Sequence, residues 1–394
     1  MNSDFCLPAD FQKACDRHWS SRRRQDRKAE LLACLSTEKS AEAAGLLETL
    51  KSSEDKQTLN IASQKLRSLA AQSIEALQAA VKSADLLSTV GADAASLREQ
   101  LRYGLLMTEY IRDRVAAPWI DAGDIENACA KIGVQKGDIL LVHSSYSKLG
   151  HVIGGAQAVV DGLIAAVGPE GTVVMPTLSQ ENFEHAYEEW RLDRPSDVGF
   201  LTEFFRKLPG AERSNQQTHS VAAIGRLAHE LTKEHTAYGP RYCLFGDYAF
   251  SHSSPWQKMY DLGGKVLFLG AIAATNTYKH FIECSQVERR LDAVRDPKLR
   301  QELIDGLWKY EEYDRVVAGD KSKACPMYNS MAVTAVLDDE GFVSHGKLGD
   351  ADLLFMDIQT MVRETTRILE SDLARWYPEA EVAWFRKADS CAGQ

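Results

Sequence analysis

The chain has 394 residues, of which 44% are hydrophobic and 26% charged, and its formal net charge is −10. This length allows two domains, or one large domain with an extension, and the composition is ordinary for a soluble globular protein. The negative charge argues against nucleic acid as the main partner, which calls for a basic surface, and it is compatible with a cationic or amine substrate.

The amino-terminal third lacks the prolines that usually interrupt the helices and strands of a compact α/β domain. There is no proline between Pro8 and Pro118, and the interval is rich in strong helix formers. Apolar residues recur at helical spacing on two faces: Leu66, Leu69, Ile74, Leu77 and Val81, then Leu97, Leu101, Leu105, Thr108, Ile111 and Val115. We therefore expect residues 1–117 to form an all-α extension, which leaves open a homo-oligomer or a protein partner bound through its helices.

Two further features of the sequence bear on partners and compartment. The basic run from Arg22 to Lys28 is short and isolated, so we interpret it as a solvated helix start rather than a nucleic-acid site. Eight scattered cysteines form no CxxC pair, so we expect no metal. Residues 1–19 hold no apolar segment of signal-peptide length and no stretch of the chain reaches transmembrane length, so we expect a cytoplasmic protein with reduced thiols and no membrane contact.

After Pro118 the pattern becomes that of an α/β domain, which we place at residues 118–394. The runs GDILLVHSS, GTVVMPT, SVAAIG and GGKVLFLGA are short, apolar and bounded by glycine, as buried strands are. GGAQAVVDGLIAAVG predicts a helix between the first two strands. The segment from Asn329 to Met356 reads as a hairpin that leads to a closing helix. Alternating strands and helices favour a largely buried sheet.

Polar residues and glycines follow the first predicted strand and precede the helix: His143, Ser144, Ser145, Gly150, Gly154 and Gly155. Hydroxyls, backbone N–H groups and a helix start supply hydrogen-bond donors to an anion. Lys148, inside this loop, could add a positive charge or could be a solvated surface lysine.

A second polar cluster, TNTYKHFIE, follows the run GGKVLFLGA. On a helix His280 and Glu283 share a face, where the carboxylate can fix the tautomer of the histidine and stabilise its protonated form. By spacing alone, such a pair is more often a surface ion pair.

Five motifs in order, HSSYSKLG with its following glycines, GTVVMPT, HSVAAIG, SSPWQKMYDLGGKVLFLGA and TNTYKHFIE, resemble the aminoglycoside 3-N-acetyltransferase (antibiotic N-acetyltransferase) family. The resemblance covers about residue 120 to the end of the chain. It implies an α/β core unlike that of the GNAT acetyltransferases, with coenzyme A as the acyl carrier. It also implies that residues 144–155, and Ser220 further on, lie beside the coenzyme, and that Thr277, His280 and Glu283 are catalytic. Ser254 and Pro255 match a family Ser-Pro pair that we interpret as a helix N-cap.

The stretch RSNQQTHSVAAIG departs from the family, which usually carries His-Pro, two residues and then Ser before this strand. Counting back from Ser220 puts Gln216 at the position of that histidine, the general base that the resemblance implies, and glutamine cannot take up a proton. His219 lies three positions later, which in an extended segment directs its side chain to the opposite face. Gln216 and His219 are therefore both candidate catalytic residues, and we expect His219 to be no automatic substitute.

The resemblance implies transfer of an acetyl or other short acyl group from acyl-coenzyme A to an amine nitrogen of a small molecule. Because the family histidine is missing, we expect a biosynthetic intermediate rather than a clinical aminoglycoside. Glu184, Glu188 and Glu189 could meet this amine or form a solvated helix face. A non-catalytic acyl-coenzyme A-binding or scaffold protein, or the same fold with a changed acyl-transfer reaction, remain open alternatives.

Overall fold

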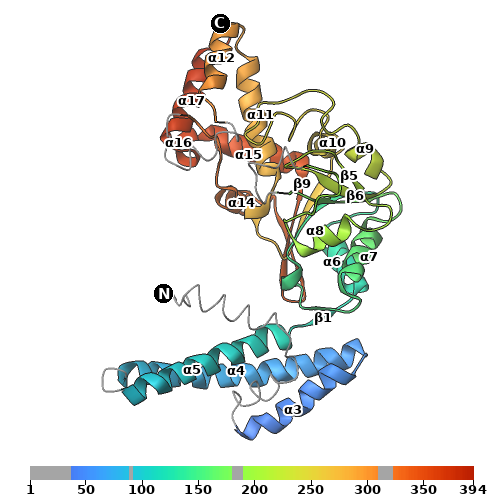
Figure 1. Ribbon diagram of the computed structural model, residues 1–394, viewed down its shortest axis with the longest axis vertical. Coiled ribbons are helices and arrows are strands. Elements are labelled where there is room, and N and C mark those ends of the chain that lie inside the picture. Colours follow the sequence, from blue (N-terminus) through green and yellow to red (C-terminus); the bar gives the residue numbers. More distant parts are fainter. Residues whose placement is uncertain (1–36, 88–91, 180–189, 309–322) are drawn as a thin grey trace. The chain divides into compact units, whose positions relative to one another are not determined.

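The computed structural model describes residues 37–87, 92–179, 190–308 and 323–394 (Figure 1). The chain divides into two compact units, Met1–Trp119 and Ile120–Gln394. Two predictions lie outside the described residues. They are the solvated helix start at Arg22–Lys28 and the roles of the three glutamates at 184, 188 and 189.

The described part of the first unit is helical. It consists of α3 (Thr37–Ser52), α4 (Lys56–Leu87), α5 (Ala92–Tyr110) and a π-helical turn, η1 (Ile111–Val115), and α4 packs against both α3 and α5 (Figure 1). Leu66, Ala70 and Met107 are in the small core between these helices. On the first predicted face, Leu66, Leu69, Ile74 and Val81 are buried, so the helical periodicity there is confirmed.

The second unit is built on a seven-stranded mixed sheet. Its strand order is β5 (Glu212–Arg213), β6 (Val221–Gly225), β4 (Thr172–Pro176), β2 (Ile139–Ser144), β7 (Lys265–Leu269), β9 (Ala351–Asp357) and β8 (Ser344–Leu348). β2 runs parallel to β4 and to β7, and the remaining pairs are antiparallel. All four predicted strands are present. β1 (Trp119–Ile120) and β3 (His151–Val152) are two-residue strands outside this sheet.

Helices cover both faces of the sheet (Figure 1). Leu140 and Val142 of β2 pack toward α6 (Ala122–Ile132), α7 (Gly155–Val167) and α8 (Phe200–Phe205). Ile139 and Leu141 pack into the core on the opposite face. The helices on that side are α9 (Ala228–Thr232), α10 (Pro255–Asp261), α11 (Tyr278–Asp292), α12 (Pro297–Asp305), α14 (Ser330–Asp339), α15 (Ile358–Ser371), α16 (Leu373–Trp376) and α17 (Glu379–Ser390). Burial on both faces explains why these strands read as continuous apolar runs.

One predicted element is wrong. The segment that opens at Asn329 begins with a helix, α14, and only the later hairpin of β8 and β9 and the closing helix α15 match the prediction. The Asn329 side chain accepts hydrogen bonds from the N–H groups of Met331 and Ala332, and Val333 and Leu337 are buried four residues apart. The short apolar pattern of this segment fits the period of a strand as well as that of a helix, and the N-cap favours the helix.

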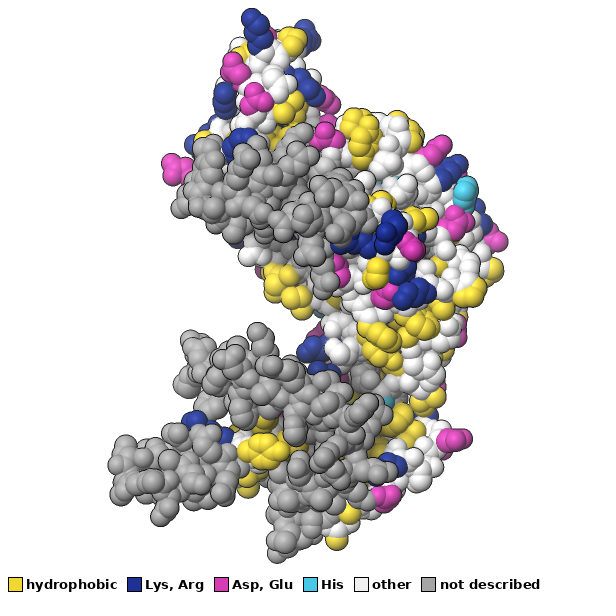
Figure 2. Space-filling view, viewed as in Figure 1, with side chains coloured by type: hydrophobic (Ala, Val, Ile, Leu, Met, Phe, Trp, Pro, Cys, Tyr) yellow, Lys and Arg dark blue, Asp and Glu magenta, His cyan; other side chains and the backbone are white. Residues whose placement is uncertain are grey.

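The predicted cap at Ser254 is confirmed. Its Oγ accepts the N–H of Gln257 at 3.2 Å, and Pro255 occupies the first turn of α10, where no backbone donor is needed. On the face drawn in Figure 2, acidic and basic side chains are intermixed over α12 and α17, which Lys387 and Glu302 link at 3.9 Å. Within the described ranges, no helix is long and apolar enough to cross a membrane.

Candidate active site

A cavity in the second unit lies at the carboxyl edge of its parallel strands. β2, β4 and β7 all end at this edge, and β6, antiparallel to β4, begins there. Ligand sites of open α/β sheets are typically found at this edge. The cavity has a volume of about 270 Å³ and is lined by His143, Ser144, Pro176, Leu178, Val198, Thr202, His219, Ala274, Thr275, Asn276, Thr277 and His280. It therefore brings together five of the predicted site residues.

His280 and Glu283 lie one turn apart near the start of α11. His280 Nδ1 is 2.7 Å from Glu283 Oε2, and Glu283 Oε1 accepts the N–H of Tyr328 at 3.0 Å. The carboxylate, only 7% exposed, is thus held at both oxygens. A carboxylate can only accept hydrogen bonds, so the neutral imidazole carries its proton on Nδ1 and keeps a lone pair on Nε2. The predicted pairing of these two side chains is present, and His280 lines the cavity.

Thr277 immediately precedes α11 and also lines the cavity. Its hydroxyl makes no capping hydrogen bond to the helix backbone. It is therefore placed to donate to an oxygen of a ligand in the cavity.

His219 faces the same cavity from the turn before β6. Its ring is completely buried and packs against Phe245 and Phe250, with centroid separations of 4.7 and 4.8 Å. The ring of His280 meets it edge to face at 5.7 Å. Burial, and then the neighbouring His280 and His235, hold the pKa of His219 well below its usual value, so the imidazole is neutral near pH 7. Its Nε2 is buried and has no hydrogen-bond partner among the residues that the structure describes.

The expectation that residues 216–219 are extended is wrong. Residues 217–219 form a turn, and Gln216 Oε1 accepts the N–H of Thr218 at 2.9 Å and the N–H of His219. Gln216 is buried and does not line the cavity. Its amide therefore holds the turn together, and the turn is what brings His219 to the cavity despite the three-residue spacing.

His143 lies at the end of β2, buried and stacked on Phe268 with ring centroids 5.1 Å apart. Burial lowers the pKa of His143 to about 3. Like that of His219, the buried Nε2 of His143 has no hydrogen-bond partner within the described part of the chain. The cavity wall thus holds two neutral imidazoles as well as His280.

The predicted coenzyme loop continues from Ser144 through a 3₁₀ turn, Tyr146–Lys148, to the start of α7. Gly150, Gly154 and Gly155 have φ values of 85°, 86° and 64°, a backbone conformation that other residues adopt at a cost. A Cβ on Gly154 would lie 3.0 Å from Ala158 Cβ. Ser144 lines the cavity, whereas Ser145, Lys148 and these three glycines do not.

A helix of 13 residues entered through left-handed glycines leaves its first N–H groups open to an anion. Hydroxyls of Ser144 and Ser145 stand at the other end of the loop. These residues fit a ligand that carries phosphates.

Ser220 belongs to a polar network behind the cavity wall. Its Oγ donates to the Thr177 carbonyl at 2.9 Å and accepts from Arg213 Nε at 3.2 Å. It does not line the cavity. Nothing in this arrangement tests whether it contacts a coenzyme, so that role stays a prediction.

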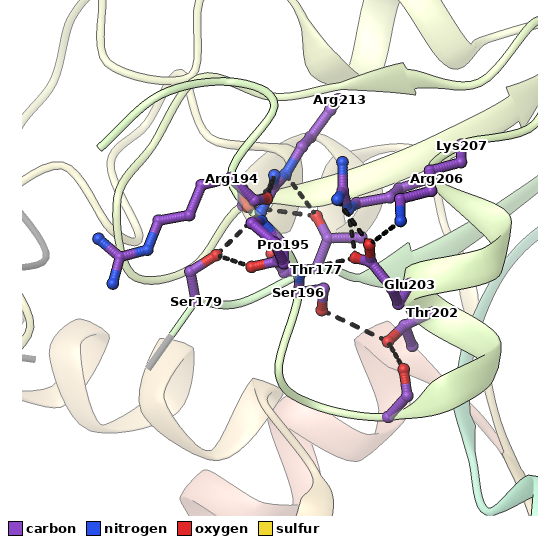
Figure 3. A network of polar contacts seen from close by, with 12 residues as sticks. Thr177, Ser179, Arg194, Pro195, Ser196, Thr202, Glu203, Arg206, Lys207 and Arg213 are labelled. Carbon is purple, nitrogen blue, oxygen red and sulfur yellow. Dashed lines mark hydrogen bonds and ion pairs between the residues drawn. The ribbon is translucent and has the colours of Figure 1, made fainter. Parts of the chain in front are cut away.

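Arg213 is the centre of this network, and sequence reasoning gave it no role (Figure 3). Its guanidinium donates to the carbonyls of Thr177, Leu192 and Arg194, and lies 4.8 Å from the ring centroid of Trp190. It thereby fastens the segment after Trp190 to the end of β4. Burial lowers the pKa of Arg213 to about 10, so it remains charged at neutral pH. A buried Arg inside a polar loop has no sequence signature.

The same segment leads to α8 and carries part of the cavity wall. Glu203 accepts hydrogen bonds from Arg206 and from the N–H of Ser196, and Ser196 Oγ lies 3.2 Å from the Leu178 carbonyl (Figure 3). Val198 and Thr202 line the cavity from here. In the part of the chain that the structure describes, no group of three His, Cys, Asp or Glu side chains could hold a metal ion.

An α/β sheet with a His–Glu pair and a hydroxyl at its carboxyl edge defines a candidate acid–base site. Comparison with known families identifies its class. The family model described as aminoglycoside 3-N-acetyltransferase matches residues 141–370, more than half of the chain. The chain belongs to this family, whose members are acyltransferases that use acetyl-coenzyme A.

Individual members of this family are also similar in sequence to the chain. An aminoglycoside N(3)-acetyltransferase III from Salmonella sp is 36% identical over 176 residues, which are 40% of this chain and 58% of the relative. This chain thus matches somewhat over half the length of that protein. An enzyme of the same name from Pseudomonas aeruginosa is 29% identical over 265 residues, covering 62% of this chain and 92% of the relative.

Among solved structures, the crystal structure of aminoglycoside acetyltransferase AAC(3)-Xa matches 68% of this chain and 98% of its own. The TM-score is 0.51 and the sequence identity 22%. This similarity supports the mixed α/β fold of the second unit.

Proposed function

We propose that the second unit is an acyl-coenzyme A-dependent N-acyltransferase that acylates a nitrogen of a small molecule. The observation that carries this proposal is that His280, whose Nδ1 lies 2.7 Å from Glu283 Oε2, lines one cavity together with Thr277. Membership of the family supports the reaction class. The core fold is, in this proposal, distinct from that of the GNAT acetyltransferases.

His280 acts as the general base. Nε2 takes a proton from the attacking nitrogen while that nitrogen bonds to the acyl carbon, and Glu283 stabilises the imidazolium through Nδ1. The bond between the acyl carbon and sulfur breaks, and the departing thiolate receives the proton from His280. Thr277 donates a hydrogen bond to the acyl oxygen, where negative charge develops before the sulfur leaves.

The loop from Ser144 to Gly155 holds the acyl donor. Acetyl-coenzyme A, when bound, supplies an acetyl group activated as a thioester. Ser144 lies where this loop meets the cavity, and the start of α7, entered through Gly154 and Gly155, presents N–H groups to the phosphates. His143 and Lys148 belong to the same proposed site.

The acceptor is, in this proposal, a biosynthetic intermediate rather than a clinical aminoglycoside. The volume of about 270 Å³ suits a small molecule, since it lies just below the roughly 300–1,000 Å³ common for ligand pockets. His219 faces the acceptor as a neutral imidazole, and surroundings that keep this imidazole neutral also disfavour the several positive charges of an aminoglycoside.

Thiol release from acetyl-coenzyme A on addition of small-molecule amine pools tests the reaction. We expect release that depends on an acceptor and on His280. Tight binding of coenzyme A without acceptor-dependent release would favour the scaffold alternative instead. In a sensitive bacterium, expression of the chain should leave gentamicin susceptibility nearly unchanged, and strong resistance would contradict the proposed acceptor class.

A further inference from the structure

Two imidazoles, not one, face the acceptor. The family resemblance accounts for His280, but it gives no role to His219, whose buried Nε2 has no partner within the described residues. Whether this nitrogen donates or accepts a hydrogen bond depends on the tautomer of the ring, and the surroundings of Nδ1 settle that.

His219 Nδ1 lies 2.9 Å from Thr218 Oγ1, which itself lies 3.2 Å from the carbonyl oxygen of Phe245. A hydroxyl has one proton to give. If Thr218 donates to the carbonyl, the imidazole donates from Nδ1 to Thr218 and both contacts are hydrogen bonds. If Thr218 donates to Nδ1 instead, the hydroxyl and carbonyl oxygens face each other without a proton between them. The first arrangement satisfies more groups, so Nδ1 carries the proton and Nε2 carries a lone pair.

His280 has the same tautomer for a different reason, because its Nδ1–H donates a hydrogen bond to Glu283 Oε2 at 2.7 Å. Both rings line the cavity, each carries an unprotonated Nε2, and the ring centroids are 5.7 Å apart. Two acceptors in the wall of one cavity match a nucleophile that has two hydrogens to donate and a lone pair left for attack. A neutral NH₂ group is such a nucleophile, and an ammonium ion is not, since it has no lone pair.

We propose that His219 Nε2 accepts a second hydrogen bond from the attacking nitrogen, and that His219 and His280 together select a neutral, weakly basic NH₂ group such as that of an aromatic amine, hydroxylamine or hydrazine. This inference rests on the proposed function. An alkyl amine with a pKa near 10.4 is neutral in only about one molecule in 2,500 at pH 7, whereas an aromatic amine, whose lone pair is delocalised into the ring, is almost entirely neutral. No histidine at position 216 is then needed to deprotonate the incoming amine.

The test compares aniline, which has two N–H groups, with N-methylaniline, which has one, as acceptors for acetyl-coenzyme A. For the wild-type protein we expect kcat/KM for aniline to be about threefold to tenfold higher than that for N-methylaniline. This is the factor that the free energy of one ordinary hydrogen bond gives. The variant His219→Leu keeps an apolar side chain between Phe245 and Phe250 but has no acceptor, and this preference should fall to near one. His219→Gln, which places an amide oxygen near the position of Nε2, should keep most of the preference.

A direct readout needs no variant. In the ¹⁵N NMR spectrum of the wild-type protein, His219 Nε2 should give the signal of an unprotonated nitrogen, and aniline should shift it toward that of a hydrogen-bonded acceptor. A protonated Nε2, or a preference for aniline that survives in His219→Leu, overturns the inference.

The two proposals fail separately. Acylation of alkyl amines with no acylation of aniline would overturn this inference and leave the proposed function standing. No acyl transfer to any amine would contradict both.

Discussion

The rings of His219 and His280 meet edge to face, with centroids 5.7 Å apart and planes at 81°. His219 comes from the turn before β6 and His280 from α11. Only His280 is paired with a carboxylate, so the two rings have different chemistry: His280 can hold a proton as an imidazolium, whereas His219 stays neutral.

Replacing His280 by Ala should lower turnover at least about tenfold, and by up to the roughly 10²–10⁴-fold that a positioned general base contributes. Glu283→Gln should cost less, because the imidazole keeps a hydrogen-bond partner and loses only a charge. The matched control is His345→Ala, which breaks an exposed His–Asp pair also 2.7 Å long. Steady-state kinetics measure turnover in each variant. Equal losses of turnover in His280→Ala and His345→Ala would show that His280 is not the general base.

Gly154→Ala should weaken coenzyme A binding severalfold, because a Cβ would strain the left-handed backbone and lie 3.0 Å from Ala158 Cβ. Gly341→Ala is the control, since Gly341 has nearly the same φ, 82° against 86°, with nothing within 4 Å of the added carbon. Isothermal calorimetry measures both affinities. Unchanged affinity in a folded Gly154→Ala protein would show that coenzyme A does not bind at this loop.

Arg213→Lys should destabilise the protein by about 1.5–3 kcal/mol and raise the KM of the acceptor, because Lys cannot reproduce the guanidinium contacts that fasten the cavity wall. Arg226→Lys, at an exposed ion pair with Glu170, is the control and should be nearly neutral. Urea unfolding and acceptor kinetics test this. A stable Arg213→Lys protein with unaltered KM would show that the network does not position the wall.

Stability should fall as the pH drops from 7 to 5.5. His143, His219 and His235 are buried, and burial holds the pKa of each below its usual value, to about 3 for His143 and His235. In the unfolded chain these histidines bind protons with a pKa near 6.5, whereas in the folded protein they stay neutral. The free energy of unfolding therefore falls below that pH, by roughly 4 kcal/mol for three histidines between pH 7 and 5.5.

Urea unfolding at the two pH values measures this fall. His235→Gln, which lies outside the cavity, should reduce it by about a third. Glu203, whose pKa is lowered to about 2, loses its contribution only below about pH 4.5, so it does not affect this window. An unfolding free energy that is flat from pH 7 to 5.5 would contradict the neutral state of the buried imidazoles.

Much of this site could be predicted from the sequence because its parts are local. The four strands are apolar runs buried on both faces, and His280 and Glu283 pair within one helical turn. The position of His219 could not be predicted, because it depends on a turn that Gln216 stabilises through backbone contacts. Arg213 was also missed, since the three carbonyls to which it donates lie 19 to 36 residues away along the chain.

A crystal structure with coenzyme A bound is the decisive test of acyl transfer in this cavity. We expect the phosphates to lie against the loop from Ser144 to Gly155, and the thiol to lie in the cavity beside Thr277 and His280. Coenzyme A bound elsewhere, with its thiol away from His280, would contradict it.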